Sequence, residues 1–243
     1  MKTMRLTLPN GRNATLAVAP ELTPTSDRTL KLAPLENRRV VAFFIGGAGD
    51  KESYYGSGPH GNIDAARTPF DKRIMDTGKS QYYQSHYLDY SEVRGESDIK
   101  KHVTGRIELK AIPIYIVGHS LGAWNGAHLS QRLDADGYSV KMLITLDPVG
   151  AGVLVWAGSD IYRSIPDPRA DMWINVFADP KDSDQSDGVA NFGERWLIKS
   201  GPNINATMDI NHYSARKMFH NKIHNEKSAA DYMFDSIDEY INR

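Results

Sequence analysis

IYIVGHSLGAWNGAHLS, residues 114–130, places a serine between two glycines where one hydrophobic pattern gives way to another. The apolar, largely β-branched run before Gly118 predicts a strand that is buried on both faces. The small and helix-forming residues after Gly122 predict a helix. A nucleophilic serine in a sharp strand-to-helix turn needs small neighbours two positions away on either side, and the two glycines supply them. The pattern therefore predicts that Ser120 is a catalytic nucleophile; the alternative is a tight turn with a structural serine.

Strands and helices alternate through most of the remaining sequence. Such alternation predicts the α/β class, with a mostly parallel central sheet and helices on both faces. Gly137 is a natural stop for the helix that follows Ser120. The expected strands lie within residues 40–45, 81–90, 112–118, 139–146 and 171–180, and the expected helices within 66–78, 97–110, 121–137 and 227–243.

The chain of 243 residues has the length of one large α/β domain. We expect a single domain over residues 1–243, in which residues 1–38 form a hairpin and a connection and residues 39–243 form the catalytic core. The hairpin is indicated by alternating residues on both sides of Asn10-Gly11.

Composition and charge exclude several classes of function. A formal net charge of −1 argues against a nucleic-acid-binding protein, and the lack of cysteine excludes disulfides, thiolate metal sites and cysteine nucleophiles. The N-terminus has no apolar core of a secretory signal, and no segment has the length of a membrane span. We therefore expect a cytoplasmic protein, or one exported without a cleaved signal peptide.

Two segments resemble a known superfamily. VGHSLGAW, residues 117–124, resembles the nucleophile segment of α/β-hydrolase lipases and esterases. LITLDPVG, residues 143–150, resembles the Leu-Asp-Pro segment of pancreatic-type lipases and of a looser group of bacterial lipase-like hydrolases. The resemblance implies the α/β-hydrolase fold and a catalytic triad in the chain order Ser, Asp, His.

The base and the acid of such a triad follow from chain order. His212 lies in a polar loop before a helix late in the chain, where the fold requires the base. His128 lies in the helix after Ser120 and would point away from the serine, while His220 and His224 are expected to be solvated. The resemblance favours Asp147 as the acid. The alternative is Asp179, which ends the next strand, and either aspartate could instead initiate an Asp-Pro turn.

The glycine-rich segment FIGGAGD, residues 44–50, follows a predicted strand at the point where an oxyanion hole requires a backbone amide. The expected oxyanion donors are the amides of Leu121 and of Gly47 or Ala48. The spacing of these glycines matches neither of the common phosphate-binding motifs. A cluster of Asp182, Asp184 and Asp187 lacks the spacing of a calcium loop and is expected to be solvated.

Two apolar segments are expected to border the substrate. Leu154 and Trp156 belong to an apolar run after Asp147 that either lines an acyl pocket or packs into the core. Tyr54 and Tyr55 lie in the other segment that we expect at the rim.

Together these features predict a serine hydrolase of carboxylic esters, acting on lipid or phospholipid acyl esters. The alternatives are a thioesterase or amidase with the same triad, and a non-catalytic binding protein that has kept the fold. The chemistry requires no cofactor and no metal. The expected partner is a small-molecule or lipid ester, with transient contact with a membrane surface and no nucleic acid; no protein partner is indicated.

Overall fold

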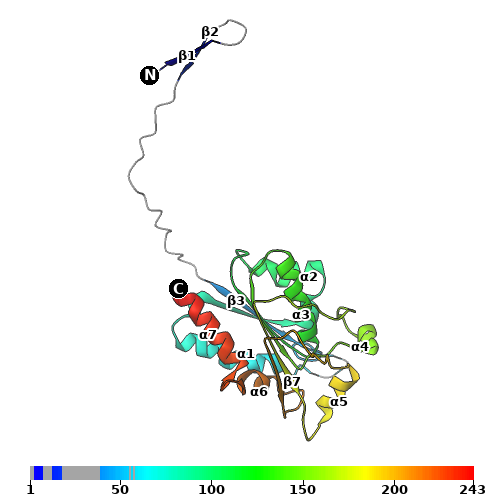
Figure 1. Cartoon of the computed structure of the whole chain (residues 1–243). Helices are drawn as coiled ribbons and strands as arrows, with labels where there is room; N and C mark the ends of the chain where they lie inside the picture. Colours follow the sequence, from blue (N-terminus) through cyan, green and yellow to red (C-terminus); the bar gives the residue numbers. More distant parts are fainter. Residues whose placement is uncertain (1–2, 8–12, 18–38, 55, 57) are drawn as a thin grey trace. The chain divides into compact units, whose positions relative to one another are not determined.

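The computed structural model describes residues 3–7, 13–17, 39–54, 56 and 58–243 (Figure 1). The chain divides into two compact units, Met1–Glu36 and Asn37–Arg243. In the first unit, β1 (Thr3–Thr7) pairs antiparallel with β2 (Asn13–Ala17), as expected for a hairpin. The predicted turn at Asn10-Gly11 and most of the predicted connection lie outside the described residues.

The second unit is built on a six-stranded sheet with the strand order β4-β3-β5-β6-β7-β8. Each neighbouring pair in this sheet is parallel, which confirms the predicted α/β class. The strands are β3 (Val40–Gly46), β4 (Tyr83–Asp89), β5 (Ile114–His119), β6 (Val140–Leu146), β7 (Met172–Ala178) and β8 (Ile204–Met208).

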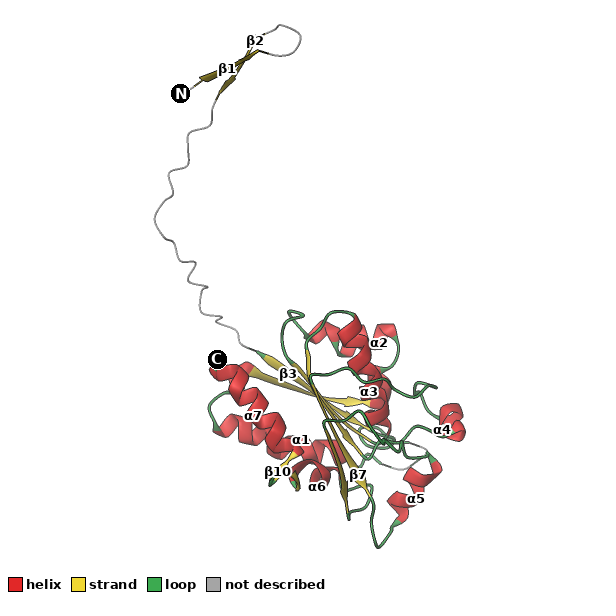
Figure 2. Cartoon of the chain, viewed as in Figure 1, coloured by secondary structure: helices red, strands yellow, loops and turns green. Residues whose placement is uncertain are grey.

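Helices cover both faces of this sheet (Figure 2). α2 (Glu96–His102) and α3 (Leu121–Ala135) lie on one face, and α1 (Asn62–Asp76), α6 (Ala215–His220) and α7 (Ala229–Asn242) lie on the other. α4 (Val153–Gly158) and α5 (Gln185–Phe192) lie beyond the carboxyl ends of the strands. Two short strands, β9 (Lys222–His224) and β10 (Lys227–Ser228), pair with each other before α7.

The alternation of side chains along β3 explains its continuous apolar sequence. Phe43 and Ile45 belong to the core cluster that includes α3, whereas Ala42 and Phe44 belong to the cluster that includes α1, α6 and α7. Every residue of this strand is buried. A strand with a hydrophobic cluster on each face has no solvated side and therefore no polar alternation.

Two features differ from the sequence-based expectation. Residues 205–208 were expected to belong to the polar loop that contains His212, but they form most of β8 (Ile204–Met208), the edge strand, in which Asn205 and Thr207 are exposed. An edge strand pairs on one side only, so its apolar signal is weak. The helix expected over residues 97–110 ends at His102 and is followed by a short 3₁₀ turn.

Candidate active site

Ser120 occupies a strained turn between β5 and α3. β5 ends at His119 and α3 begins at Leu121, so the turn consists of this one residue. Its backbone angles are φ 57° and ψ −127°. A positive φ is rare for residues other than glycine and costs conformational free energy, which the surrounding structure must offset. The turn presents the Ser120 side chain at the carboxyl end of the sheet.

The two glycines around Ser120 have no room for a side chain. A Cβ atom on Gly118 would lie 2.5 Å from Ala123 Cα, and one on Gly122 would lie 2.3 Å from the carbonyl oxygen of Ile45. These are backbone atoms that cannot move aside without distorting the strand or the helix. The steric reason given for the Gly-x-Ser-x-Gly pattern is therefore present in the structure.

Ser120, His212 and Asp147 form one hydrogen-bonded chain. The distance from Ser120 Oγ to His212 Nε2 is 3.0 Å, and that from His212 Nδ1 to Asp147 Oδ2 is 2.6 Å. Because a carboxylate only accepts, Nδ1–H donates to Asp147 and leaves Nε2 free to accept from the serine hydroxyl. His212 and Asp147 are buried, and Ser120 is 9% exposed. The structure thus brings together the three residues that the sequence singled out.

The backbone of His212 is held from two sides. Its N–H donates to Asp187 Oδ1 at 3.1 Å, and its carbonyl oxygen accepts from His119 Nε2 at 2.8 Å. The rings of His119 and His212 lie 4.7 Å apart. Burial lowers the pKa of His119 to about 3, so this neighbouring ring is uncharged at neutral pH. These contacts fix the backbone of His212, and the His119 ring adds no charge beside the imidazole.

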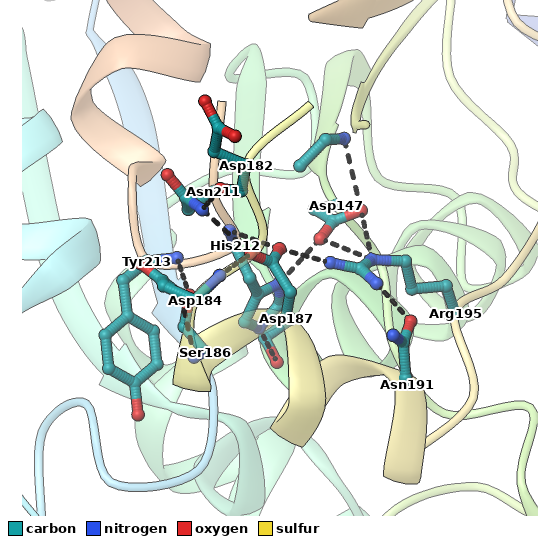
Figure 3. Close-up of polar contacts among 12 residues, drawn as sticks. Asp147, Asp182, Asp184, Ser186, Asp187, Asn191, Arg195, Asn211, His212 and Tyr213 are labelled. Carbon is teal, nitrogen blue, oxygen red and sulfur yellow. Dashed lines mark hydrogen bonds and ion pairs between the residues drawn. The ribbon is translucent and has the colours of Figure 1, made fainter. Parts of the chain in front are cut away.

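Asp147 follows the end of β6 and is fully buried. Its φ of 41° lies in the left-handed region, which aspartate tolerates better than most residues. Oδ1 accepts from the backbone N–H of Ala178 at 3.3 Å, and Arg195 Nε donates to Oδ2 at 2.9 Å (Figure 3). Burial raises the pKa of Asp147, but the hydrogen bond from His212 and the Arg195 guanidinium outweigh burial and hold it below its usual value.

The other candidate residues lie elsewhere. Among the side-chain hydrogen bonds of the described residues, none joins Asp179 to His212, and Asp179 lines a separate cavity with Pro180 and Glu194. His128 is buried on α3, and its Nε2 bonds the carbonyl oxygen of Ser164. His224 is exposed, as expected, but His220 is only half-exposed because it contacts the Ala66 carbonyl oxygen.

The loop after β3 lies directly beside Ser120. A Cβ atom on Gly47 would lie 2.6 Å from Ser120 Cβ, so only glycine permits this approach. Asp50 anchors the loop: its N–H donates to the Gly47 carbonyl oxygen at 3.2 Å, and its Oδ2 accepts from Ile63 N at 3.1 Å at the start of α1. Burial raises the pKa of Asp50 to about 6. Leu121 starts α3, so its N–H has no acceptor within the helix.

A cavity of about 320 Å³ opens beside Ser120. Its wall is predominantly apolar and comes from the β3 loop, the elbow, α4 and α5. The lining includes Tyr54 and Leu154, which were expected to border the substrate, and Ala48 and Leu121, which were expected to provide oxyanion donors. The other apolar lining residues are Val149, Val155, Val189 and Phe192. Tyr55 lies outside the described residues.

Trp156 is a correction to the expected substrate wall. It lies on α4 but outside the cavity lining, because its side chain packs against the core cluster of α3. Its indole N–H donates to the Gly150 carbonyl oxygen at 2.7 Å. The sequence left two possibilities for this apolar run, an acyl pocket or the core. Leu154 lines the cavity and Trp156 packs against the core, because residues two positions apart on a helix point in different directions.

Two charged residues of the site were not identified from the sequence. Asp187 was expected to be solvated, yet it is buried and accepts from Asn211, His212 and the backbone of Asp184 (Figure 3). Arg195 was assigned no role, and its side chain is only 9% exposed. The sequence of a polar loop does not show whether an Arg or Asp side chain in it is buried or exposed. The one available signal was the segment Ser-Asp-Gln-Ser-Asp, which resembles the capped start of a helix.

Comparison of the chain with protein-family models gives no match, and comparison with curated protein sequences gives none either. Within the described residues, no group of three or more His, Cys, Asp or Glu side chains is placed to hold a metal ion. No helix in that part of the chain is long and apolar enough to cross a membrane.

Proposed function

We propose that the protein is a serine hydrolase of carboxylic esters with an α/β-hydrolase fold. The observation that carries the proposal is the chain from Ser120 Oγ through His212 to Asp147, with distances of 3.0 and 2.6 Å, at a strand-to-helix turn beside an apolar cavity. The sequence order Ser, Asp, His supports the fold assignment. A parallel sheet with helices on both faces is compatible with it.

The chemistry follows from the hydrogen bonds. Ser120 Oγ attacks the carbonyl carbon of the ester while its proton passes to His212 Nε2. Asp147 stabilises the imidazolium that forms. The tetrahedral intermediate collapses when Nε2 returns the proton to the leaving alcohol, which yields an acyl-enzyme. Water, deprotonated by the same nitrogen, then attacks the acyl-enzyme and releases the acid and free Ser120.

The negative oxygen of the intermediate needs donors that are fixed in advance. The N–H of Leu121, at the first turn of α3, is one expected donor, and Gly47 or Ala48 in the adjoining loop provides the other. The proximity of Ala48 and Leu121 to Ser120 supports this assignment, because both residues line the same cavity as the serine. The positive end of the α3 dipole adds to the stabilisation.

The cavity supports an acyl chain as the substrate group. Apolar side chains of α4 and α5 surround it, and a volume of about 320 Å³ is at the small end of ligand sites. Leu154 and Phe192 at its rim are each 66% exposed, which would suit a lipid or phospholipid acyl ester better than a polar substrate.

A covalent probe and an ester panel test this proposal. A fluorophosphonate should label the wild-type protein once, and Ser120→Ala should abolish labelling without changing the melting temperature. p-Nitrophenyl esters of increasing chain length, with a thioester and an anilide of the best acyl group, should show hydrolysis that falls by several orders of magnitude in Ser120→Ala. Equal ester hydrolysis by wild type and Ser120→Ala would refute the proposal.

A further inference from the structure

Arg195 lies behind the Ser-His-Asp chain and contacts both buried carboxylates of the site. Nε donates to Asp147 Oδ2 at 2.9 Å and to Oδ1 at 3.2 Å, and Nη2 donates to Asp187 Oδ1 at 2.8 Å. Nη1 donates to Asn191 Oδ1. Figure 3 shows the Arg195 guanidinium beside both aspartates. One side chain therefore connects the acid of the proposed triad to α5, the helix that carries Asp187 and Asn191.

The charges of this cluster do not cancel. Asp147 and Asp187 are buried, and Arg195 is the cation that contacts both. Two carboxylates and one guanidinium leave one negative charge in excess while His212 is neutral. Protonation of His212 removes that excess. Because charges interact strongly in a poorly solvated site, the Arg195 guanidinium offsets part of the negative charge that the two carboxylates place beside His212.

We propose that Arg195 is a positioning residue, which fixes the Asp147 carboxylate against His212 and sets the strength of His212 as a base. The inference rests on the proposed function, since a base matters only if Ser120 is the nucleophile. Without the guanidinium, two uncompensated carboxylates would retain a proton on His212 up to higher pH. A protonated His212 cannot accept the proton of Ser120, so activity would begin at higher pH.

The charged group that ion-pairs with the His212 side chain is Asp147. From β5 it faces His119, which is uncharged at neutral pH because burial lowers its pKa to about 3. From the end of β6 it faces Asp147, and from α5 Asp187 accepts its backbone N–H. The ring of Tyr213, the next residue, lies 6.2 Å away. The charge balance at His212 is therefore set by Asp147, Asp187 and Arg195.

The decisive experiment compares charge and geometry at position 195. Arg195→Gln retains donor groups and removes the charge, whereas Arg195→Lys retains the charge and loses the planar fork that binds two oxygens. Asp187→Asn removes a negative charge from the same cluster. Arg67→Gln is the matched control, because Arg67 is a partly buried arginine that pairs with Asp64 and Asp71 on α1. The full chain is used, and a thermal melt accompanies each variant.

The readout is kcat/KM of the best p-nitrophenyl ester against pH. We expect the midpoint of the acidic limb to rise by about one pH unit in Arg195→Gln and to fall by about half a unit in Asp187→Asn, since the two changes alter the charge in opposite senses. In Arg195→Lys the midpoint should stay within about 0.3 units while kcat falls about tenfold, because a lysine lacks the planar fork by which Nε and Nη2 hold Asp147 and Asp187 at the same time. Arg67→Gln should change neither.

The outcomes separate this inference from the proposed function. If wild-type Ser120 neither reacts with a fluorophosphonate nor hydrolyses an ester, both fall. Suppose that the wild type is active, but that Arg195→Gln and Asp187→Asn leave the midpoint of the acidic limb unchanged or shift it in the same direction. Only the proposed role of Arg195 is then refuted. If either of these variants does not fold, Arg195→Lys still decides: a wild-type kcat, or a limb displaced by more than about one unit, overturns the role.

Discussion

Asp147 and Asp179 both directly follow a strand and both precede a proline, so their sequences alone do not tell them apart. The difference is local geometry. Asp147 has a left-handed backbone, which directs its carboxylate to His212 Nδ1 at 2.6 Å. The sequence could predict this juxtaposition only through resemblance to pancreatic-type lipases. It could not predict that the same carboxylate also accepts from Arg195, because that contact joins loops 48 residues apart.

We predict that Asp147→Asn lowers kcat by about 10⁴, equivalent to about 5 kcal/mol of activation free energy. Asparagine retains the size of the side chain but loses the charge that stabilises the imidazolium, and it can favour the wrong tautomer of His212. Asp179→Asn should remain within about tenfold of wild type, since Asn forms similar turns. Steady-state kinetics on the best ester, with thermal melts of both variants, checks this. A collapse of kcat in Asp179→Asn alone would transfer the role of the acid to the later strand.

At the scale of elements, the sequence predicted the strands and helices with a clear hydrophobic pattern, but it predicted only part of the segments that form the candidate site. The continuous apolar run of β3 and the strand and helix around Ser120 predict their own structure, because both depend on burial and on the glycines that the turn requires. β8 and α5 were missed. β8 is an edge strand that exposes Asn205 and Thr207, and α5 begins among acidic residues that resemble a solvated loop until Asp187 is seen to be buried.

The two readings of α4 can be separated by matched truncations. We predict that Leu154→Ala changes the preference among ester chain lengths with little change in melting temperature, because Leu154 lines the cavity and is already 66% exposed. Trp156→Ala should lower the free energy of unfolding by about 2–4 kcal/mol and leave the chain-length profile unaltered, since its ring packs against the core and its N–H bonds Gly150. The ester panel and a denaturant titration measure both effects. A changed chain-length profile in Trp156→Ala with wild-type stability would reverse the assignment.

At the scale of the whole molecule, both hydrophobic clusters and every residue of the candidate site come from the unit Asn37–Arg243. The first cluster residue along the described chain is Val40, at the start of β3. A sheet of six parallel strands with helices on both faces buries enough apolar surface for a unit of this size to fold without help. The assignment of a catalytic core to residues 39–243 stays a prediction.

We therefore predict that a fragment comprising residues 37–243 folds and retains the chemistry. Its melting temperature should lie within about 3 °C of the full chain, which for a protein of this size corresponds to roughly 1 kcal/mol. Its rate of fluorophosphonate labelling and its kcat on the best ester should stay within about twofold, because Ser120, His212, Asp147 and Arg195 are all present. The control is the same fragment with Ser120→Ala, which should melt alike and label not at all. A fragment that folds but labels more than tenfold slower would mean that residues 1–36 contribute to catalysis, and one that does not fold would mean that they contribute to the stability of the core.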